Sequence, residues 1–323
     1  MFDTFPGFWT PVMGAAELRD QPVGMTLAGE RIVLFRGKDG VGALLDRCPH
    51  RGVALSLGKV VDGTLECPFH GWRFDSRGGC AHIPMNPGAQ RGGTTALPVR
   101  ERGHLIWVYT GLQTDTEPYV PPALLREGGR IEIVHEEWRT HWTRAMENML
   151  DSPHLPWVHG GTIGRGLRAQ LRPDSTMHQE LIDREFGFEA HFRMDEGEPG
   201  QINWLRPNGM ELFILDTPRA FMRMHSWCIP TTHNHTRMLV VGVKDFGWAI
   251  NPFLGLTEGF NRRVLGEDRH VLESSDPPRV PPPNQEQNVP TDKVTLRFRT
   301  WYHKHLAPLD DASEARRAAG VAA

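Results

Sequence analysis

The sequence is poor in cysteine and has no long apolar run. Four cysteines in 323 residues exclude a disulfide-stapled secreted scaffold. No stretch approaches the roughly 18 apolar residues of a membrane-spanning helix. The N-terminal MFDTFPGFWTPVMG also lacks the basic start and apolar core of a secretory signal. We therefore expect a cytoplasmic protein without a membrane partner, in which clustered cysteine and histidine bind metal more often than they form disulfides.

The chain also lacks a large net charge of either sign. The 36 Lys and Arg residues nearly balance the 39 Asp and Glu residues, and the formal net charge is −3, so we expect no nucleic-acid partner. No Gly-rich dinucleotide fingerprint occurs, which means that any NAD(P)H chemistry must take place on another protein. Hydrophobic residues make up 39% of the chain, enough for a buried core, and the length predicts two domains of ordinary size.

The first of these domains is predicted to consist of β-strands. Short β-like runs separated by turn signals fill residues 20–110, a pattern typical of a small antiparallel sandwich or barrel. The polar, Pro- and Gly-rich stretch QTDTEPYVPPALLREGG marks a boundary near residues 115–125. We place the two domains at residues 1–118 and 119–323.

The second domain combines helices with one antiparallel sheet. Apolar residues at helical spacing predict a helix in WRTHWTRAMENML that ends before Pro153 and Pro156. GFEAHFRM, ELFILDT, AFMRMHSWCI and TRMLVVGVKDF are predicted strands, residues 251–275 a helix, and KVTLRFRTWYHKHL a closing helix or a strand-to-helix segment. The expected fold class of the whole chain is α+β.

The strongest motif lies in the first domain, where Cys48-x-His50 is followed by Cys67-x2-His70 and each pair is followed by glycine. Two thiolates on one iron and two imidazoles on the other form a mixed-ligand [2Fe–2S] cluster. A zinc site or an incidental core cluster are the alternatives. Both pairs at the correct spacing, each with its glycine, favour the iron–sulfur cluster.

In these residues the chain resembles the Rieske proteins. The Rieske proteins of respiratory bc complexes carry two further, disulfide-bonded cysteines where this chain has Val53 and Phe69, and a serine where it has Trp72. The resemblance therefore implies a low-potential cluster outside a respiratory complex.

A second motif is Asn148-Met-Leu-Asp151-Ser-Pro-His154-Leu-Pro-Trp-Val-His159. Two imidazoles at a helix broken by prolines can turn toward one point, and a 2-His-1-carboxylate site leaves positions open on Fe(II) for O2. The His-x4-His spacing is weak by itself, but it gains weight because it follows a Rieske motif.

Together the two motifs resemble the catalytic (alpha) subunits of the Rieske non-heme iron oxygenases over essentially the whole chain. The resemblance implies a helix-grip (START-like) catalytic domain, His154 and His159 as ligands of the mononuclear iron, and Asp151 as a carboxylate that links a ligand histidine to a cluster histidine of a neighbouring subunit. Asn148 lies three residues before Asp151, as in the monooxygenase and demethylase branch, whereas the comparable Asn of naphthalene-type dioxygenases lies four residues before.

The third iron ligand must come from the C-terminal half. Our choice is Asp268 in GEDRHVLE, which resembles the helix that carries the Asp ligand in that branch. Glu267 and Glu273 are nearby competitors whose helical spacing points them to other, solvated faces, and Asp292 is a weaker rival.

Other residues receive less specific interpretations. His233 and His235 are expected in a surface turn, and Cys80 and Cys228 as ordinary buried thiols. Most of the Trp, Phe and Met residues of the second domain should be core, and a few should line the substrate pocket; they are Trp204, Met210, Phe213, Phe221, Met222, Met224 and Trp227.

The function implied by the resemblance is O2-dependent hydroxylation or oxidative demethylation of a bulky, polycyclic or aromatic small molecule. Its electrons would come from a separate NAD(P)H-dependent reductase or ferredoxin, and its assembly would be a head-to-tail homotrimer. The alternatives are a Rieske-type electron carrier, and a ligand-binding protein without a functional mononuclear iron.

Overall fold

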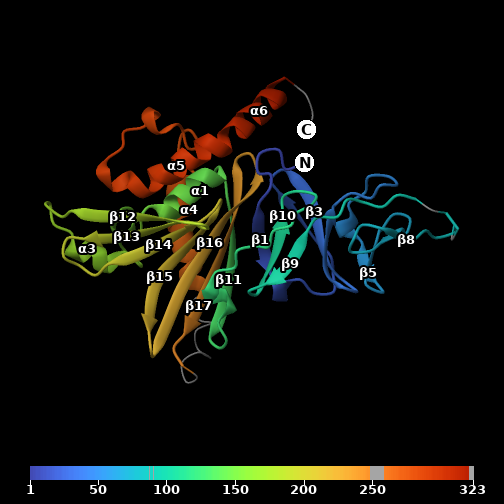
Figure 1. Cartoon of the computed structure of the whole chain (residues 1–323), viewed down its shortest axis with the longest axis horizontal. Helices are drawn as coiled ribbons and strands as arrows, with labels where there is room; N and C mark the ends of the chain where they lie inside the picture. Colours follow the sequence, from blue (N-terminus) through green and yellow to red (C-terminus); the bar gives the residue numbers. More distant parts are fainter. Residues whose placement is uncertain (87, 90, 248–257, 320–323) are drawn as a thin grey trace. The chain divides into compact units, whose positions relative to one another are not determined.

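The computed structural model describes residues 1–86, 88–89, 91–247 and 258–319. They form two compact units, Met1–Val120 and Pro121–Ala323, which Figure 1 shows in blue to cyan and in green to red. The division falls inside the Pro- and Gly-rich stretch identified in the sequence.

The first unit is built from antiparallel strands, as expected. They form three small sheets with the orders β1-β10-β9, β2-β3-β4 and β5-β6-β7-β8. Their bounds are β1 Trp9–Gly14, β2 Val23–Leu27, β3 Glu30–Gly37, β4 Gly40–Leu45, β5 Lys59–Val61, β6 Thr64–Glu66, β7 Arg73–Phe74, β8 Cys80–His82, β9 Val99–Arg102 and β10 Leu105–Tyr109.

β3 is the central strand of this unit. Ile32, Val33, Leu34 and Phe35 are all fully buried, and successive side chains of a strand point to opposite faces. Both faces of β3 are therefore covered. The core on one side includes the two motif cysteines together with Val33, Phe35, Leu44, Leu55, Leu65 and Phe74.

The second unit contains one large antiparallel sheet. Its strand order is β11-β17-β16-β15-β14-β13-β12, so the first strand pairs with the last. The bounds are β11 Arg130–Trp138, β12 Met177–Arg184, β13 Gly187–Met194, β14 Gly200–Leu205, β15 Gly209–Thr217, β16 Ala220–Thr232 and β17 His235–Asp245. The predicted strands of this domain are confirmed.

Three of the described α-helices lie between the strands β11 and β12, and three follow β17. They are α1 Trp142–Leu150, α2 Leu155–Val158, α3 Arg165–Gln170, α4 Glu258–Leu272, α5 Lys293–His305 and α6 Ala307–Ala318, with short 3-10 turns η1 Ala15–Glu17, η2 Leu55–Leu57, η3 Pro122–Leu125, η5 Pro283–Gln285 and η6 Pro290–Asp292. α1, α4 and α5 confirm the helix predictions, although residues 251–257 of the predicted helix at 251–275 lie outside the described residues. The α+β fold class is confirmed.

The predicted helix break at the second motif is also present. α1 ends at Leu150, and its C-cap Asp151 has an extended backbone; Pro153 then disfavours helical dihedrals at Ser152, so the helix does not resume there. α2 then begins with Pro156 in its first turn, where a missing N–H is tolerated. The break places His154 and His159 at the two ends of one short helical turn.

Aromatic packing fixes the helices against the sheet. Trp142 of α1 meets Phe298 and Tyr302 of α5 edge to face, with ring centroids 6.0 and 5.8 Å apart. Trp204 of β14 meets Phe298 and Trp301 in the same way, at 5.7 and 5.2 Å. Such contacts between large rings stabilise the arrangement beyond the burial of their area.

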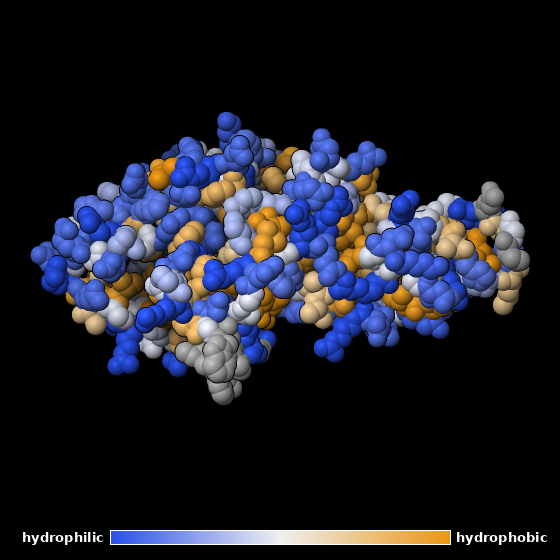
Figure 2. Space-filling view, turned by 60° about the horizontal axis from the view of Figure 1, so that its bottom comes forward, coloured by the Kyte–Doolittle hydropathy of each residue, from blue (hydrophilic) through white to orange (hydrophobic). Residues whose placement is uncertain are grey.

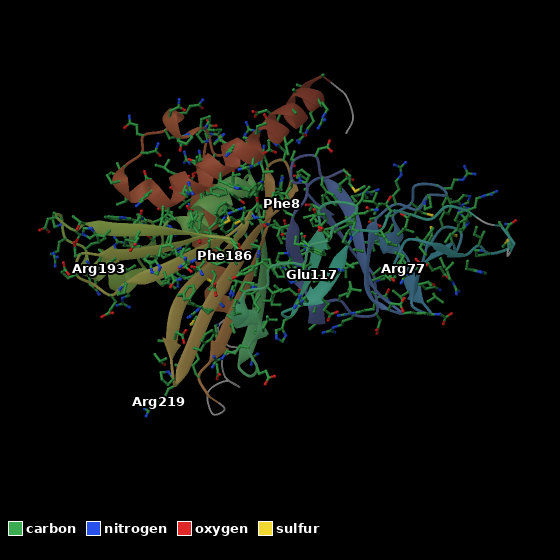
Figure 3. All side chains as sticks on the ribbon, in the orientation of Figure 1. Phe8, Arg77, Glu117, Phe186, Arg193 and Arg219 are labelled. Carbon is green, nitrogen blue, oxygen red and sulfur yellow. The ribbon has the colours of Figure 1, made fainter. Side chains whose placement is uncertain are left out.

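The surface carries charge of both signs. Figure 2 shows a face on which hydrophilic side chains interrupt the apolar patches. Arg219, in the turn between β15 and β16, projects away from the sheet (Figure 3). Among the described residues, no helix combines the length and apolar character needed to cross a membrane.

Candidate functional site

Two similar loops carry the first motif. In the first loop the Cys48 N–H donates to the Val53 carbonyl at 2.8 Å, and the Gly52 N–H donates to the Cys48 carbonyl at 2.8 Å. The second loop repeats the pattern, since the Gly71 N–H donates to the Cys67 carbonyl at 3.0 Å. Each loop therefore wraps tightly around its own cysteine.

The glycines make this wrapping possible. Gly52 and Gly71 have φ angles of +73° and +70°, in the left-handed region that glycine enters without steric cost. A Cβ on Gly71 would also lie 2.9 Å from Pro84 Cγ. The turns of both loops therefore depend on glycine at these positions.

The loops place sulfur inside and imidazole outside. Cys48 and Cys67 are each 2% exposed, whereas His50 is half-buried and His70 is exposed. The two imidazole rings lie 4.7 Å apart, and the Trp72 ring stacks on His50 at 4.7 Å with an interplanar angle of 8°. This arrangement fits a cluster with a buried thiolate end and an accessible imidazole end.

The protonation chemistry of the loops also fits a metal cluster. Burial raises the pKa of the Cys48 thiol, the His50 backbone N–H partly opposes this, and the adjacent Cys67 raises the pKa again. The Cys48 thiol therefore resists ionisation without a cation, which iron would supply. Burial, followed by His70 and Arg51, lowers the pKa of His50 and favours the neutral imidazole that binds metal. No described residue hydrogen-bonds to the buried His50 Nδ1.

In the second unit the structure brings His154, His159 and Asp268 together. Their candidate ligand atoms all lie within 4.8 Å of one another. Asp268 Oδ1 is 3.0 Å from His159 Nε2 and 3.6 Å from His154 Nε2. Asp268 is 3% and His159 1% exposed. Two imidazoles and one buried carboxylate at these distances can hold one metal ion in a 2-His-1-carboxylate arrangement.

A further carboxylate lies beside each histidine. Asp151 Oδ2 is 3.4 Å from His154 Nδ1, and Glu267 Oε2 is 2.9 Å from His159 Nδ1. The Thr162 hydroxyl donates to the same Glu267 oxygen at 2.6 Å. A carboxylate hydrogen-bonded to the second ring nitrogen, as Glu267 is to His159, fixes the tautomer and turns the other nitrogen toward the metal.

These contacts also set the charge of the site. Burial lowers the pKa of His159, but the hydrogen bonds to Asp268 and Glu267 together outweigh it, and the pKa is raised. Burial raises the pKa of Glu267, but the hydrogen bonds from His159 and Thr162 outweigh this effect, so that the pKa of Glu267 is lowered overall. Glu267 is therefore an ionised partner of the His159 ring.

The expectation of a solvated face is wrong for Glu267. Glu267 precedes Asp268 on α4, and the His159 ring lies between the two carboxylates, bonded to one through each nitrogen. Glu273 accepts the Arg139 backbone N–H at 2.9 Å, just beyond the end of α4. Asp292 accepts the Val289 N–H at 2.8 Å before α5. The sequence did not identify Glu267 as an orienting partner, because only the fold brings α2 to α4.

The other histidines and cysteines lie outside the triad. His233 lies in the turn between β16 and β17, where His235 begins β17, as expected; His233 is 3.2 Å from Glu314. Cys228 is fully buried, which raises the pKa of its thiol well above the usual range. Cys80 is only half-buried, which corrects the expectation of a buried thiol.

The triad opens into an apolar cavity of about 310 Å³. Alternate residues of the sheet line it, which places their side chains on one face, and α1 and α4 line it from the opposite side. Asn148 and Asp151 belong to the wall next to the triad. The apolar residues that line the cavity include Val134, Met149, Leu155, Ile163, Ile202, Met210, Leu212, Ile214, Met222, Met224, Val240, Val264 and Leu265. The expectation that a few of the methionines line the pocket is confirmed for Met210, Met222 and Met224.

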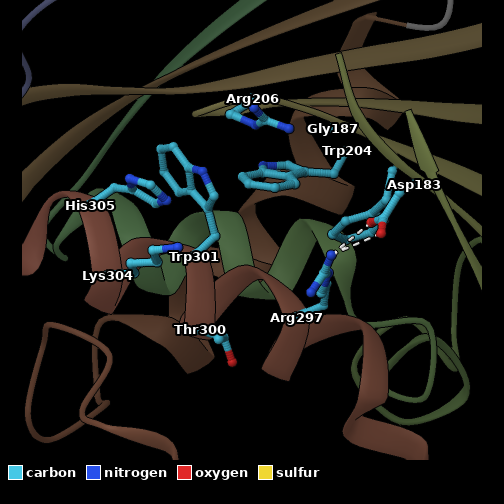
Figure 4. A pocket seen from close by; sticks show the side chains of 10 residues that line it. Asp183, Gly187, Trp204, Arg206, Arg297, Thr300, Trp301, Lys304 and His305 are labelled. Carbon is cyan, nitrogen blue, oxygen red and sulfur yellow. Dashed lines mark hydrogen bonds and ion pairs between the residues drawn. The ribbon is translucent and has the colours of Figure 1, made fainter. Parts of the chain in front are cut away.

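A second cavity, of about 250 Å³, lies elsewhere in this unit (Figure 4). Arg206 lies above Trp204 and Trp301, with its guanidinium 5.8 and 6.0 Å from the ring centroids. Asp183 is bonded to Arg297 at 2.8 Å. The carboxylate of this second cavity is therefore already paired with an arginine. The cavity beside the triad remains the candidate active site.

Comparisons with known proteins agree with both sites. The Rieske [2Fe–2S] domain matches residues 8–98, and the vanillate O-demethylase oxygenase C-terminal domain matches residues 138–307. Chlorophyllide a oxygenase of Chlamydomonas reinhardtii is 32% identical over 312 residues, which cover 91% of this chain. The chain spans about half of that relative, 47% of its length. Methylxanthine N3-demethylase NdmB of Pseudomonas putida is 29% identical over 93% of this chain and 89% of its own length.

Solved structures share the fold. Dicamba monooxygenase bound to dicamba superimposes with a TM-score of 0.79 at 23% identity, and covers 98% of this chain and 99% of its own. A Pseudomonas putida NdmA variant with caffeine gives a TM-score of 0.77 at 25% identity, over 96% of this chain and 92% of its own. The two family matches, the cluster loops and the buried triad lead to one assignment: the chain belongs to the Rieske non-heme iron oxygenases, with a catalytic domain of the vanillate O-demethylase type.

Proposed function

We propose that this protein is a monooxygenase that uses O2 to hydroxylate or oxidatively demethylate an apolar aromatic small molecule. The convergence of His154, His159 and Asp268 at the wall of an apolar cavity carries the proposal. Cys48, His50, Cys67 and His70 would hold the [2Fe–2S] cluster, and the triad would hold the mononuclear Fe(II). An electron carrier has no use for a buried triad, which argues against that alternative.

When bound, the cluster supplies single electrons and the Fe(II) supplies the open coordination positions at which O2 is activated. The protein residues position and shield this chemistry. Glu267 holds the His159 imidazole in orientation through its second nitrogen, and Asp151 lies 3.4 Å from the second nitrogen of His154. The methionine and aliphatic walls exclude water from the reacting C–H bond.

The volume of the cavity limits the size of the substrate. A volume of about 310 Å³ is near the lower end of small-molecule sites. This volume favours a substrate with one or two rings over the larger polycyclic molecules that the family resemblance also implies. Two relatives are named methylxanthine N3-demethylase and dicamba O-demethylase, and by analogy we propose removal of a methyl group from nitrogen or oxygen as the first reaction to test.

The partners are part of the same proposal. A separate NAD(P)H-dependent reductase or ferredoxin in the cytoplasm would deliver the electrons. In a head-to-tail homotrimer, Asp151 would connect His154 to a cluster histidine of the neighbouring chain; the Asp151 side chain is 27% exposed, and His70 is exposed at the cluster. Light scattering of the purified holoenzyme tests the trimer.

Turnover tests the reaction. Holoenzyme, a surrogate reductase, NADH and a panel of one- and two-ring methyl ethers and N-methyl heterocycles are incubated under 18O2, and the products are analysed by mass. We expect either addition of one labelled oxygen atom or loss of one methylene unit with release of formaldehyde. O2-independent products, or reduction of the cluster without any substrate-dependent O2 uptake, would contradict the proposal.

A further inference from the structure

The second cavity of this unit is lined mainly by aromatic and basic side chains (Figure 4). Phe188 of β13 and Trp204 of β14 are 1% and 2% exposed, and their ring centroids are 5.2 Å apart. The Trp204 indole N–H donates to the Pro207 carbonyl at 3.0 Å, which fixes that ring. Gly187 adds only backbone to this wall, because a Cβ there would lie 2.1 Å from the Trp204 carbonyl oxygen. The sheet therefore offers a rigid aromatic surface to one planar ring.

One face of α5 forms the second wall of this cavity. Arg297, Trp301 and Lys304 are spaced four and three residues apart and all line the cavity, which places them on one side of the helix. Trp301 meets Trp204 edge to face, with the ring centroids 5.2 Å apart. Tyr302, on another side of α5, is fully buried. The cavity therefore lies between the sheet and the side of α5 that is not in the core.

Positive charge surrounds the cavity. Arg206, Arg297 and Lys304 line it together with a single acid, Asp183. Asp183 is bonded to Arg297 at 2.8 Å, and these two charges balance each other. Arg206 and Lys304 are exposed, and in the part of the chain that the structure describes neither forms an ion pair. Three cations against one acid leave an excess of two positive charges, in a chain whose formal net charge is −3. Such a cavity attracts anions.

The surrounding structure positions Arg206 beside the aromatic surface. The Arg206 backbone N–H donates to the Phe186 carbonyl at 2.7 Å, which joins the turn after β14 to the turn between β12 and β13. The Arg206 guanidinium is 5.8 Å from the Trp204 ring centroid and 6.0 Å from that of Trp301, within the range of a cation–π contact. A planar guanidinium can donate two parallel hydrogen bonds to a carboxylate. The cavity therefore combines a ring surface with a carboxylate-binding group.

We propose that this second cavity binds a single-ring aromatic carboxylate at a site separate from the triad. Its volume of about 250 Å³ is below the usual range of small-molecule sites, which favours one ring with a short substituent. A small inorganic anion would leave the aromatic walls in water, and a neutral ring would gain nothing from the positive charge. The inference goes beyond the proposed function and does not depend on it, because none of the triad residues lines this cavity.

The test compares benzoate, benzamide and acetate by calorimetry on the anaerobic holoenzyme, since these probes present a ring with a charge, a ring alone and a charge alone. We expect benzoate to bind about tenfold or more tightly than either of the others, and added salt to weaken benzoate but not benzamide. In the R206M/K304M variant, benzoate affinity should fall about tenfold. R206K keeps the charge but not the planar fork, so its benzoate affinity should lie between those of the wild type and R206M/K304M.

Controls separate this cavity from other sites. R193M/R219M removes two exposed cations of the same unit that do not line the cavity (Figure 3), and benzoate affinity should not change. Asp268→Ala removes a triad residue of the other cavity and should also leave benzoate affinity as it is. Cluster absorbance and circular dichroism confirm that each variant is folded.

Three results would overturn the inference. The first is that benzoate binds no more tightly than benzamide, or that no probe binds. The second is an equal loss of benzoate affinity in R206M/K304M and R193M/R219M, which would indicate a general charge effect. The third is a benzoate affinity that depends on Asp268 and not on Arg206, which would place the ligand in the triad cavity. Iron content and O2-dependent turnover of the same wild-type sample judge the proposed function separately.

Discussion

The two metal sites of this chain are built in opposite ways. The cluster site comes from two loops close in sequence, each wrapped around a buried cysteine, with an exposed His70 and a half-buried His50 at the rim. The mononuclear site comes from a broken helix and from Asp268, which lies more than one hundred residues later in the chain and is buried with His159. One site is accessible for electron entry and local in sequence, whereas the other is enclosed for chemistry and depends on the fold of the second unit.

The largest expected effect comes from removing a cluster thiolate. Cys67→Ser should eliminate the cluster and reduce turnover by more than about a thousandfold, because electrons then have no entry. If the two sites fold independently, as their construction indicates, the variant retains about one iron per chain. Visible absorption, electron paramagnetic resonance and iron content measure this. Loss of all iron would show that the sites are coupled.

Asp268→Ala makes the converse change. Removal of the only carboxylate in the triad of the described residues should release the mononuclear iron, leave about two irons in the cluster, and abolish turnover. The cluster spectrum should remain that of the wild type. Retention of a third iron would instead assign the third ligand to another residue.

Asp151→Asn tests the link between the two sites. Both metals should remain bound, since Asp151 contacts His154 Nδ1 at 3.4 Å rather than the triad centre. Turnover should fall by roughly a hundredfold, with slow oxidation of the reduced cluster in stopped-flow absorbance. Asp174→Asn is a matched control, because this carboxylate is 86% exposed. A variant with normal turnover would exclude Asp151 from the electron path.

Glu267→Gln should have a smaller effect on the enclosed site. Without the carboxylate at 2.9 Å from His159 Nδ1, the ring is less firmly oriented, and we expect the dissociation constant for Fe(II) to rise roughly tenfold to a hundredfold. Competition with a chelator measures the constant. Arg263→Ala is the control, since Arg263 is 67% exposed and 3.4 Å from the other Glu267 oxygen. Equal effects of the two substitutions would assign Glu267 to a surface ion pair.

The smallest expected effect is that of Glu273→Gln. Its partner Arg139 is 77% exposed, so the ion pair contributes little, and we expect the free energy of unfolding to fall by less than about 1 kcal/mol. Iron content and turnover should not change. Loss of iron here would show that the end of α4 belongs to the metal site.

The same contrast explains what the sequence could predict. The proposed cluster ligands Cys48, His50, Cys67 and His70 follow one local pattern with their glycines, and such a pattern can be predicted without knowledge of the fold. His154 and His159 share a short motif as well. Only family resemblance predicts Asp268, because helical spacing cannot say which of the acidic residues around it meets a histidine in another element.

Contacts made only by the tertiary structure were missed. Helical spacing predicts a solvated face for Glu267, yet α2 brings His159 between Glu267 and Asp268. The pairing of Lys244 with Glu132 depends on the register of the first strand against the last strand of the sheet, which no local pattern encodes. The α+β class and the long strands were predictable, since alternating apolar residues and turn signals are local properties.

Quantification of iron and acid-labile sulfide in the wild-type protein, reconstituted without oxygen, tests the central claim most directly. Two different iron sites in one chain predict about three irons and about two sulfides per chain, with about one iron removed selectively by Asp268→Ala. About two irons and two sulfides, unchanged by that substitution, would mean that the triad holds no iron and would contradict the oxygenase account.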